Sequence, residues 1–124
     1  MGIIKIAIVE DDQAIAQMYK LKFDIEGYDV QVAENGQLGL ELIKLMMPDI
    51  VLLDIMMPIM NGDEMLAQLR GTDWGKDLKV IILTNMGEQE APDRLKDLNV
   101  SGFIVKAEMT PRQVTELVKS ILAV

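Results

Sequence analysis

The sequence predicts an α/β fold in which one doubly wound, five-stranded parallel sheet is flanked by five helices. Short runs rich in β-branched residues alternate with longer amphipathic segments from one end of the chain to the other. No linker, repeat or low-complexity stretch interrupts this alternation. The length of 124 residues is typical of one domain. We therefore expect a single domain over residues 1–124.

Five short segments have the composition of strands. The predicted strands are 3–9, 29–33, 50–53, 80–83 and 102–105. Three of them are almost wholly apolar, as is typical of central parallel strands that are covered on both faces. Strict alternation with helices implies right-handed crossovers, so helices should lie on both sides of the sheet.

The segments between these strands are predicted to be helices. Their ranges are 12–26, 36–46, 62–71, 89–98 and 111–122. Thr110, Pro111 and Gln113 fit an N-cap, a first-turn proline and a capping-box partner. Gly27 and Asn99 are residue types that adopt the left-handed turn after a helix.

Composition excludes several classes of function. The formal net charge of -8 argues against a nucleic-acid surface and favours a bound cation. The absence of cysteine rules out disulfides and thiolate metal sites. No apolar run approaches the roughly 20 residues that span a bilayer, and the first residues lack a signal-peptide layout, so we expect a cytoplasmic protein.

Polar residues gather where the predicted strands end, which is where α/β sheets bind ligands. They are Glu10, Asp11, Asp12, Asp54, Thr84 and Lys106. Crowded carboxylates repel one another, and a divalent cation offsets that repulsion. Oxygen ligands without His or Cys suit Mg²⁺. A carboxylate such as Asp54 can act as a nucleophile toward phosphate, with Lys106 and Thr84 neutralising the developing charge.

Five separated motifs resemble the receiver-domain pattern of response regulators in bacterial two-component systems, including the chemotaxis regulators. These motifs are Val-Glu-Asp-Asp at 9–12, Asp-Ile-Met-Met-Pro at 54–58, Asn61-Gly62, Thr84 and Phe-Ile-Val-Lys at 103–106. The resemblance covers essentially the whole chain. It implies a flavodoxin-like sheet of strand order 2-1-3-4-5 and a receiver domain over residues 1–124.

The resemblance also implies a role for each matching residue. Asp54 would be phosphorylated by a sensor histidine kinase or a phosphotransfer protein. Mg²⁺ would be held by Asp54 and Asp11 directly, by Glu10 through water, and by the backbone carbonyl of Met56. The side chain of Met56 would then bear on access to the phosphoryl group.

The remaining motif residues complete the implied mechanism. Lys106 would pair with phosphoryl oxygens, while Thr84 and Phe103 would reorient as a switch. Such a domain catalyses only its own phosphorylation and dephosphorylation, so it is not an enzyme in the usual sense. Without a DNA-binding segment, its output should pass through contact with a downstream protein and not with nucleic acid or membrane.

Two positions depart from the family pattern. Ala107 stands where the family usually has proline, often after a cis bond; because a non-proline cis bond costs about 2.5 to 4 kcal/mol, we expect a trans bond here. Asn85 stands where the family favours a small residue, and it either restricts access to the phosphoryl group or hydrogen-bonds it.

Two further patterns concern surfaces. The apolar arc of the helix predicted at 12–26 is wider than one sheet-facing stripe requires, so part of it should be exposed, and Ile15 is a candidate contact for the kinase. Six of the ten methionines fall between positions 46 and 65. Filling gaps in the core is their expected role.

Two other functions compete with this interpretation. A magnesium-dependent phosphohydrolase of the haloacid-dehalogenase type also uses a nucleophilic aspartate, but it places a second aspartate two residues later, where this chain has Met56. A receiver-like interaction module that works without phosphorylation is the other alternative. The intact acidic set argues against it, whereas Ala107 and Asn85 leave it open.

Overall fold

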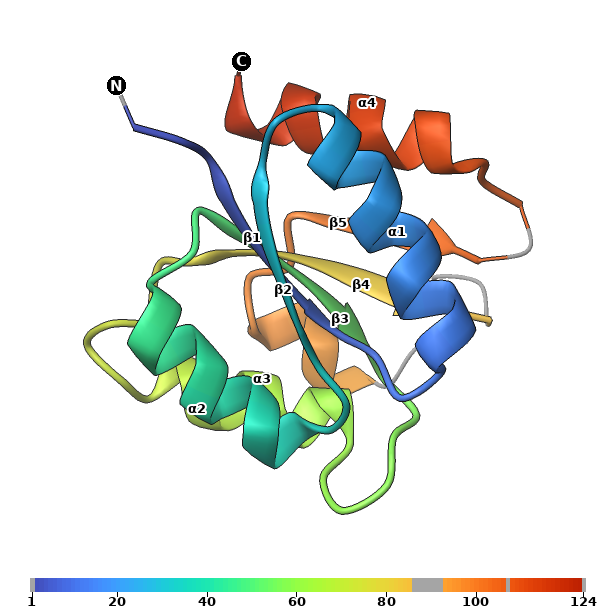
Figure 1. The fold of residues 1–124 in the computed structure, drawn as a ribbon. Coiled ribbons are helices and arrows are strands. Elements are labelled where there is room, and N and C mark those ends of the chain that lie inside the picture. Colours follow the sequence, from blue (N-terminus) through green and yellow to red (C-terminus); the bar gives the residue numbers. More distant parts are fainter. Residues whose placement is uncertain (1, 86–92, 107, 124) are drawn as a thin grey trace.

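A single parallel sheet forms the centre of the molecule (Figure 1). The computed structural model describes residues 2–85, 93–106 and 108–123. The sheet has five strands in the order β2-β1-β3-β4-β5, which confirms the expected topology. The strands are β1 (Lys5–Val9), β2 (Asp29–Ala33), β3 (Ile50–Asp54), β4 (Lys79–Thr84) and β5 (Gly102–Val105). All four neighbouring pairs are parallel.

Four α-helices lie in the described part of the chain, one fewer than predicted. They are α1 (Gln13–Ile25), α2 (Gly36–Met46), α3 (Gly62–Arg70) and α4 (Pro111–Leu122). The helix predicted at 89–98 was wrong over its described part, which forms the 3₁₀ helix η2 (Asp93–Asp97). This segment buries only Leu95, so little packing energy favours a longer helix there. Residues 89–92 lie outside the described residues.

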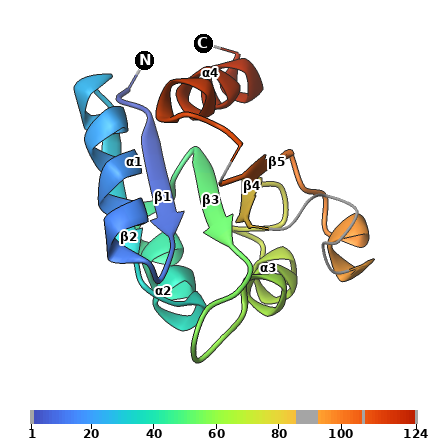
Figure 2. The ribbon, with the colours of Figure 1, turned by 90° about the vertical axis from the view of Figure 1, so that its right-hand side faces the viewer.

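The helices form two layers, one on each face of the sheet (Figures 1 and 2). On one face, α1 and α4 pack Tyr19, Phe23 and Val118 against the sheet. On the other face, α2 and α3 contribute Ile43 and Leu66, and η2 packs beside them. Because both faces are covered, the central strand β3 is buried along its whole length.

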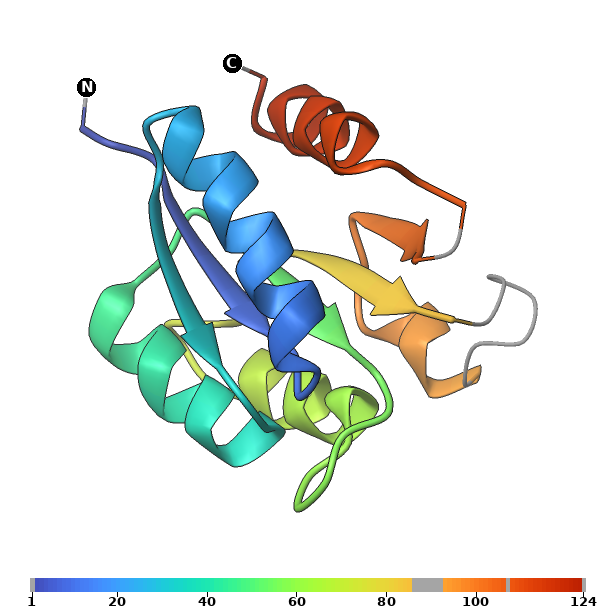
Figure 3. The same ribbon diagram turned by 45° about the vertical axis from the view of Figure 1, so that its right-hand side comes forward.

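Helix ends follow the signals in the sequence. Thr110 and Gln113 form the predicted capping box at the start of α4. Gly27 and Asn99 adopt left-handed backbone conformations, with φ of 87° and 55°. These turns return the chain to the starts of β2 and β5. All five strands run in the same direction (Figure 3). The carboxyl ends of the strands therefore meet at one edge of the sheet.

Two surface expectations can be compared with the structure. α1 buries Tyr19 and Phe23 but leaves Leu21 and Ile25 exposed, so part of its apolar arc does face solvent. Met65 is fully buried and Met46, Met57 and Met60 belong to or pack against the core, as expected of gap-filling methionines. Met47 and Met56 are exposed instead. No helix in the described ranges is both long and apolar enough to cross a membrane.

Candidate functional site

An open cavity of about 430 Å³ lies at the carboxyl edge of the sheet. Its lining residues are Glu10, Asp11, Asp12, Ile15, Asp54, Met56, Thr84, Asn85 and Lys106. Register explains this convergence, since Val9 pairs with Leu53, Asp54 with Leu83, and Thr84 with Val105. The next residue after each of β1 and β5 thus reaches the same opening. All six polar residues predicted at the strand ends line it.

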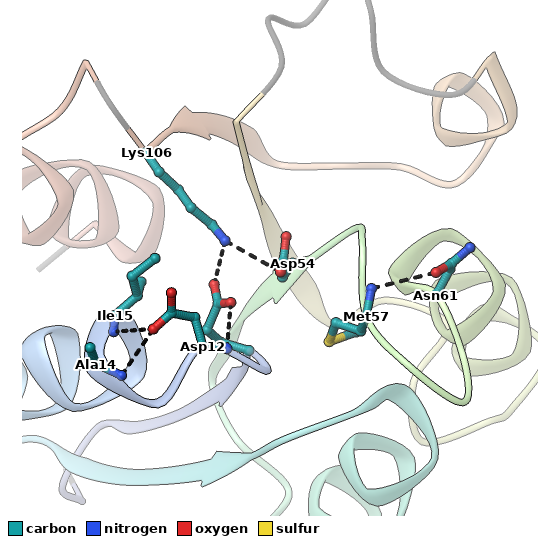
Figure 4. A network of polar contacts seen from close by, with 8 residues as sticks. Asp12, Ala14, Ile15, Asp54, Met57, Asn61 and Lys106 are labelled. Atoms are coloured by element: carbon teal, nitrogen blue, oxygen red, sulfur yellow. Dashed lines mark hydrogen bonds and ion pairs between the residues drawn. The ribbon is translucent and has the colours of Figure 1, made fainter.

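Lys106 joins two carboxylates at the floor of this cavity (Figure 4). Its Nζ lies 2.6 Å from Glu10 Oε2 and 3.3 Å from Asp54 Oδ2. Its backbone N–H donates to the Thr84 carbonyl at 2.8 Å, which continues the pairing of β5 with β4 beyond the last strand residue. The side chain of Lys106 is almost fully buried. The ammonium is therefore held in place from both ends.

Glu10 carries a buried charge that the protein satisfies only in part. Its exposed fraction is 0%. Oε1 accepts from the Asp12 backbone N–H at 3.1 Å. Oε2 contacts Lys106 but has no aligned hydrogen-bond partner among the described residues. Burial raises the pKa of Glu10 to about 7, and the negative charge of Asp54 acts in the same direction, although contacts with Lys106 and the Asp12 N–H oppose them.

Asp54 and Lys106 are perturbed by the same surroundings. Burial raises the pKa of Asp54, against the opposing effect of the Lys106 charge. Burial disfavours the charged form of Lys106, but its contacts with Glu10 and Asp54 outweigh that effect and raise the pKa of the ammonium. At neutral pH, Lys106 is thus a fixed positive charge beside two carboxylates. Asp54 is 5% exposed, yet it faces the open cavity and so can be reached from solvent.

The acidic residues fit a divalent cation. One carboxylate oxygen from each of Glu10, Asp11 and Asp54 lies within 4.8 Å of the others. Asp11 is exposed, whereas Glu10 and Asp54 are buried, so an ion would sit at the boundary between protein and solvent. The donor set is all oxygen, and Glu10 Oε2 lacks an aligned hydrogen bond. Such a set suits Mg²⁺, which binds a few carboxylates and retains waters.

The loops around the cavity are positioned by local hydrogen bonds. Asp12 is the N-cap of α1, and its Oδ1 accepts from the backbone N–H groups of Ala14 and Ile15 at 3.0 and 3.2 Å. The side chain of Asp12 is thus used to cap the helix. Across the cavity, Asn61 Oδ1 accepts from the Met57 N–H at 3.4 Å (Figure 4).

The other predicted residues lie at the rim or behind it. Thr84 ends β4 and is 2% exposed, and Asn85 beside it is exposed at the cavity. Met56 lines the cavity and is 67% exposed. Phe103 is half-buried in β5, where it packs against the core formed with α2 and α3, and it does not line the cavity. Ala107, and with it the expected trans bond, lies outside the described residues.

Sequence reasoning missed two features of the loop between β3 and α3. A Cβ on Gly62 would collide with the backbone carbonyl of Asp54, so only glycine lets α3 begin this close to the acceptor strand. A glycine at the first position of a predicted helix was the available signal. Ile59 has φ of 70°, which is strained for a β-branched residue, and the sequence carries no signal for it.

Comparisons with known proteins agree with this geometry. Residues 6–119 match a family model described as the response regulator receiver domain. The response regulator MprA of Mycolicibacterium vanbaalenii is 40% identical over 81 residues, which are 65% of this chain and 34% of that relative. The chain thus spans about a third of the length of the curated relatives that it matches.

Solved structures give the same result for the fold. The CheY-like receiver domain protein of Methanospirillum hungatei has a TM-score of 0.89 and 29% identity, with 98% of this chain and 95% of that chain covered. The chemotaxis protein CheY4 of Vibrio cholerae also has a TM-score of 0.89, over 97% of this chain and 99% of that chain. At 24% identity, the second likeness concerns the fold alone.

Proposed function

Because the chain belongs to the response regulator receiver domain family, we propose that residues 1–124 form a receiver domain that takes a phosphoryl group onto Asp54 in a Mg²⁺-dependent reaction. The observation that carries this proposal is the gathering of Asp54, two further carboxylates and the Lys106 ammonium around one open cavity. It is a signalling domain, whose chemistry is its own phosphorylation and dephosphorylation.

The transfer forms one bond and breaks another. An Asp54 carboxylate oxygen attacks phosphorus, and the bond from phosphorus to the donor opens. If the donor is a phosphohistidine of a sensor histidine kinase or a phosphotransfer protein, the electron pair of the P–N bond returns to the imidazole, which takes up a proton. The carboxylate must be ionised to attack. Lys106, 3.3 Å from Asp54 Oδ2, favours that ionised form.

The surrounding residues offset the charge that arrives with phosphate. Bound by Asp11 and Asp54, by Glu10 through water and by the Met56 backbone carbonyl, Mg²⁺ would neutralise negative charge on the phosphoryl oxygens. Lys106 Nζ is placed to donate to a phosphoryl oxygen on Asp54. The Thr84 hydroxyl, at the end of the neighbouring strand, supplies a second donor.

Signalling requires the new phosphoryl contacts to favour a second conformation. We assign this switch to Thr84, which lines the cavity, and Phe103, which lies on the adjacent strand β5 and is half-buried. The half-buried ring has room to change its exposure. The output is a contact with a downstream protein, and the input is a contact with the kinase, for which Ile15 at the cavity rim is a candidate.

Intact-mass measurement tests the proposal. The protein is incubated with Mg²⁺ and acetyl phosphate, and we expect a gain of one phosphoryl group that is absent without Mg²⁺. Asp54→Asn should abolish the gain. Asp49→Asn is the matched control, because Asp49 immediately precedes the same strand at its opposite end and its side chain accepts from the Lys5 backbone N–H at 2.8 Å.

The outcomes separate the competing functions. Phosphorylation of the Asp49→Asn variant but not of Asp54→Asn supports the receiver. No mass gain in the unaltered protein refutes the proposal and leaves an interaction module that works without phosphorylation. Multiple-turnover release of phosphate from an unrelated phosphoester would instead indicate a hydrolase.

A further inference from the structure

Met56 has an unusual position among the methionines of this chain. The residue is 67% exposed, the largest exposed fraction of any methionine in the described ranges. Met18 and Met47 are the other exposed ones, at 43% and 55%. Of these three, only Met56 lines the cavity that contains Asp54. An oxidant that enters the phosphoacceptor cavity therefore meets Met56.

We propose that Met56 is an oxidation site through which peroxide shortens the lifetime of the phosphoryl group on Asp54. The proposal rests on the proposed function of Asp54. In the oxidation, the thioether sulfur attacks one oxygen of hydrogen peroxide, the O–O bond breaks, and after proton transfer one water molecule leaves. The sulfur is oxidised by two electrons to the sulfoxide, and peroxide is reduced. Methionine sulfoxide reductases reverse this change.

The chemistry of the sulfoxide sets the direction of the effect. The thioether of Met56 is apolar and is only a weak hydrogen-bond acceptor for water at the opening of the cavity. A sulfoxide is a strong hydrogen-bond acceptor with no donor, and phosphoryl oxygens are acceptors too. The two groups therefore cannot hydrogen-bond to each other, but one water molecule can donate to both. The sulfoxide thereby holds a water molecule at the opening of the cavity. From there the water attacks phosphorus.

The neighbours of Met56 favour selective oxidation. Met57 follows it in the chain but is 7% exposed and packs in the core. Met65 is fully buried. Met47, which caps α2 at the opposite edge of the sheet from Asp54, is exposed but does not line the cavity. Met47 is thus a matched control of the same residue type and similar exposure.

The experiment has two readouts. The whole protein is treated with limiting hydrogen peroxide, and peptide mapping by mass spectrometry measures sulfoxide at each methionine. We expect Met56 among the first to gain an oxygen atom. The protein is then phosphorylated with acetyl phosphate and Mg²⁺, and loss of the phosphoryl group is followed by intact mass. Peroxide should speed this loss about three- to tenfold. A change of this size corresponds to the net free energy of about one hydrogen bond in the activation barrier.

Variants assign the effect to one side chain. The ratio of decay rates with and without peroxide should return to one in Met56→Leu and stay raised in Met47→Leu. Treatment with methionine sulfoxide reductase should restore slow decay in the unaltered protein.

Three results would overturn the inference. They are a Met56 that stays unoxidised while Met18 and Met47 react, a decay rate that peroxide does not change, and a peroxide effect that persists in Met56→Leu. Failure of the proposed function is distinguishable, since the untreated protein would then accept no phosphoryl group at all. That result would also remove the basis of this inference.

Discussion

Two partly buried cations lie at opposite ends of the sheet and are satisfied in opposite ways. At the amino ends of β4 and β5, every hydrogen bond that Arg70 donates within the described part of the chain goes to a backbone carbonyl, at 2.6 to 3.4 Å. Those carbonyls belong to Gly75, Lys76, Leu78, Leu98 and Asn99. At the carboxyl ends, Lys106 instead faces the charged side chains of Glu10 and Asp54.

The difference separates a structural charge from a functional one. Arg70 joins α3 to two loops through neutral carbonyl dipoles, and burial lowers the pKa of its guanidinium against the opposing effect of the Asp77 charge. Around Lys106 the carboxylates outnumber the ammonium, and the pKa values of Glu10 and Asp54 are raised. The Arg70 network is complete as it stands. The Lys106 network carries surplus negative charge, which a further cation can relieve.

Replacing Arg70 tests the network at the amino ends of β4 and β5. This change should have the largest effect on the free energy of unfolding. Arg70→Met keeps much of the side-chain length but leaves three carbonyls in part-buried hydrogen bonds without this donor, so we expect a loss of about 3 kcal/mol of unfolding free energy. Urea denaturation measures it. Arg112→Met is the control, because its side chain is 83% exposed and pairs only with Glu116, so the change should stay within about 0.5 kcal/mol. Equal losses in both variants would contradict the comparison.

The pH dependence of the unfolding free energy tests the charged site around Lys106 at the carboxyl ends of the strands. Unfolded Glu10 releases its proton near pH 4.5, whereas folded Glu10 keeps it up to about pH 7. Between these values the folded state binds the extra proton, so stability is highest below the window and falls as pH rises through it. In metal-free buffer, Glu10→Gln should lack this fall and be about 2 to 3 kcal/mol more stable than the unaltered protein at pH 8. Parallel pH profiles of the two proteins, measured in urea, would refute the assignment.

Adding Mg²⁺ should restore part of the unfolding free energy that is lost when Glu10 ionises. At ten times its dissociation constant, an ion that binds only the folded state adds about 1.4 kcal/mol at pH 8. Below pH 5, where Glu10 holds its proton, the gain should shrink. Thermal denaturation with and without Mg²⁺ measures it. Asp11→Asn should lose most of the gain and Asp49→Asn should keep it. If both keep it, the ion binds elsewhere on this acidic chain.

The Arg70 network and the site around Lys106 also differ in how well they could be predicted from the sequence. The bounds of β2, β5, α2 and α4 agree with the prediction because turn and cap residues mark them. The candidate site could be located because its residues are ionisable and follow strands. The Arg70 network could not, since its acceptors are backbone carbonyls, which every residue carries. An arginine at the end of a predicted helix looks the same whether it faces solvent or joins two loops.

The loop after Asp54 shows a second limit. Asn61 and Gly62 are residue types that tolerate positive φ, whereas a β-branched residue such as Ile59 does not. In the structure, Asn61 has φ of -65° as the N-cap of α3, and Gly62 is the first helical residue. The left-handed position falls on Ile59 instead. The helix predicted from residue 62 does begin there, but the close packing of Gly62 on the Asp54 carbonyl is a tertiary constraint that local propensity does not contain.

Backbone strain also differs between the site around Lys106 and the Arg70 network, and we expect its effect on stability to be the smallest. Ile59, beside the site, and Asn99, in the Arg70 network, both have positive φ, of 70° and 55°. The left-handed conformation costs most L-residues about 1 to 2 kcal/mol, whereas asparagine tolerates it. Ile59 is 76% exposed, so Ile59→Gly loses little burial, and after the entropic cost of glycine we expect a gain of about 0.5 to 1 kcal/mol. Asn99→Gly should change stability by less than about 0.3 kcal/mol. Thermal denaturation distinguishes the two, and a destabilised Ile59→Gly would mean that contacts of the isoleucine side chain outweigh its backbone strain.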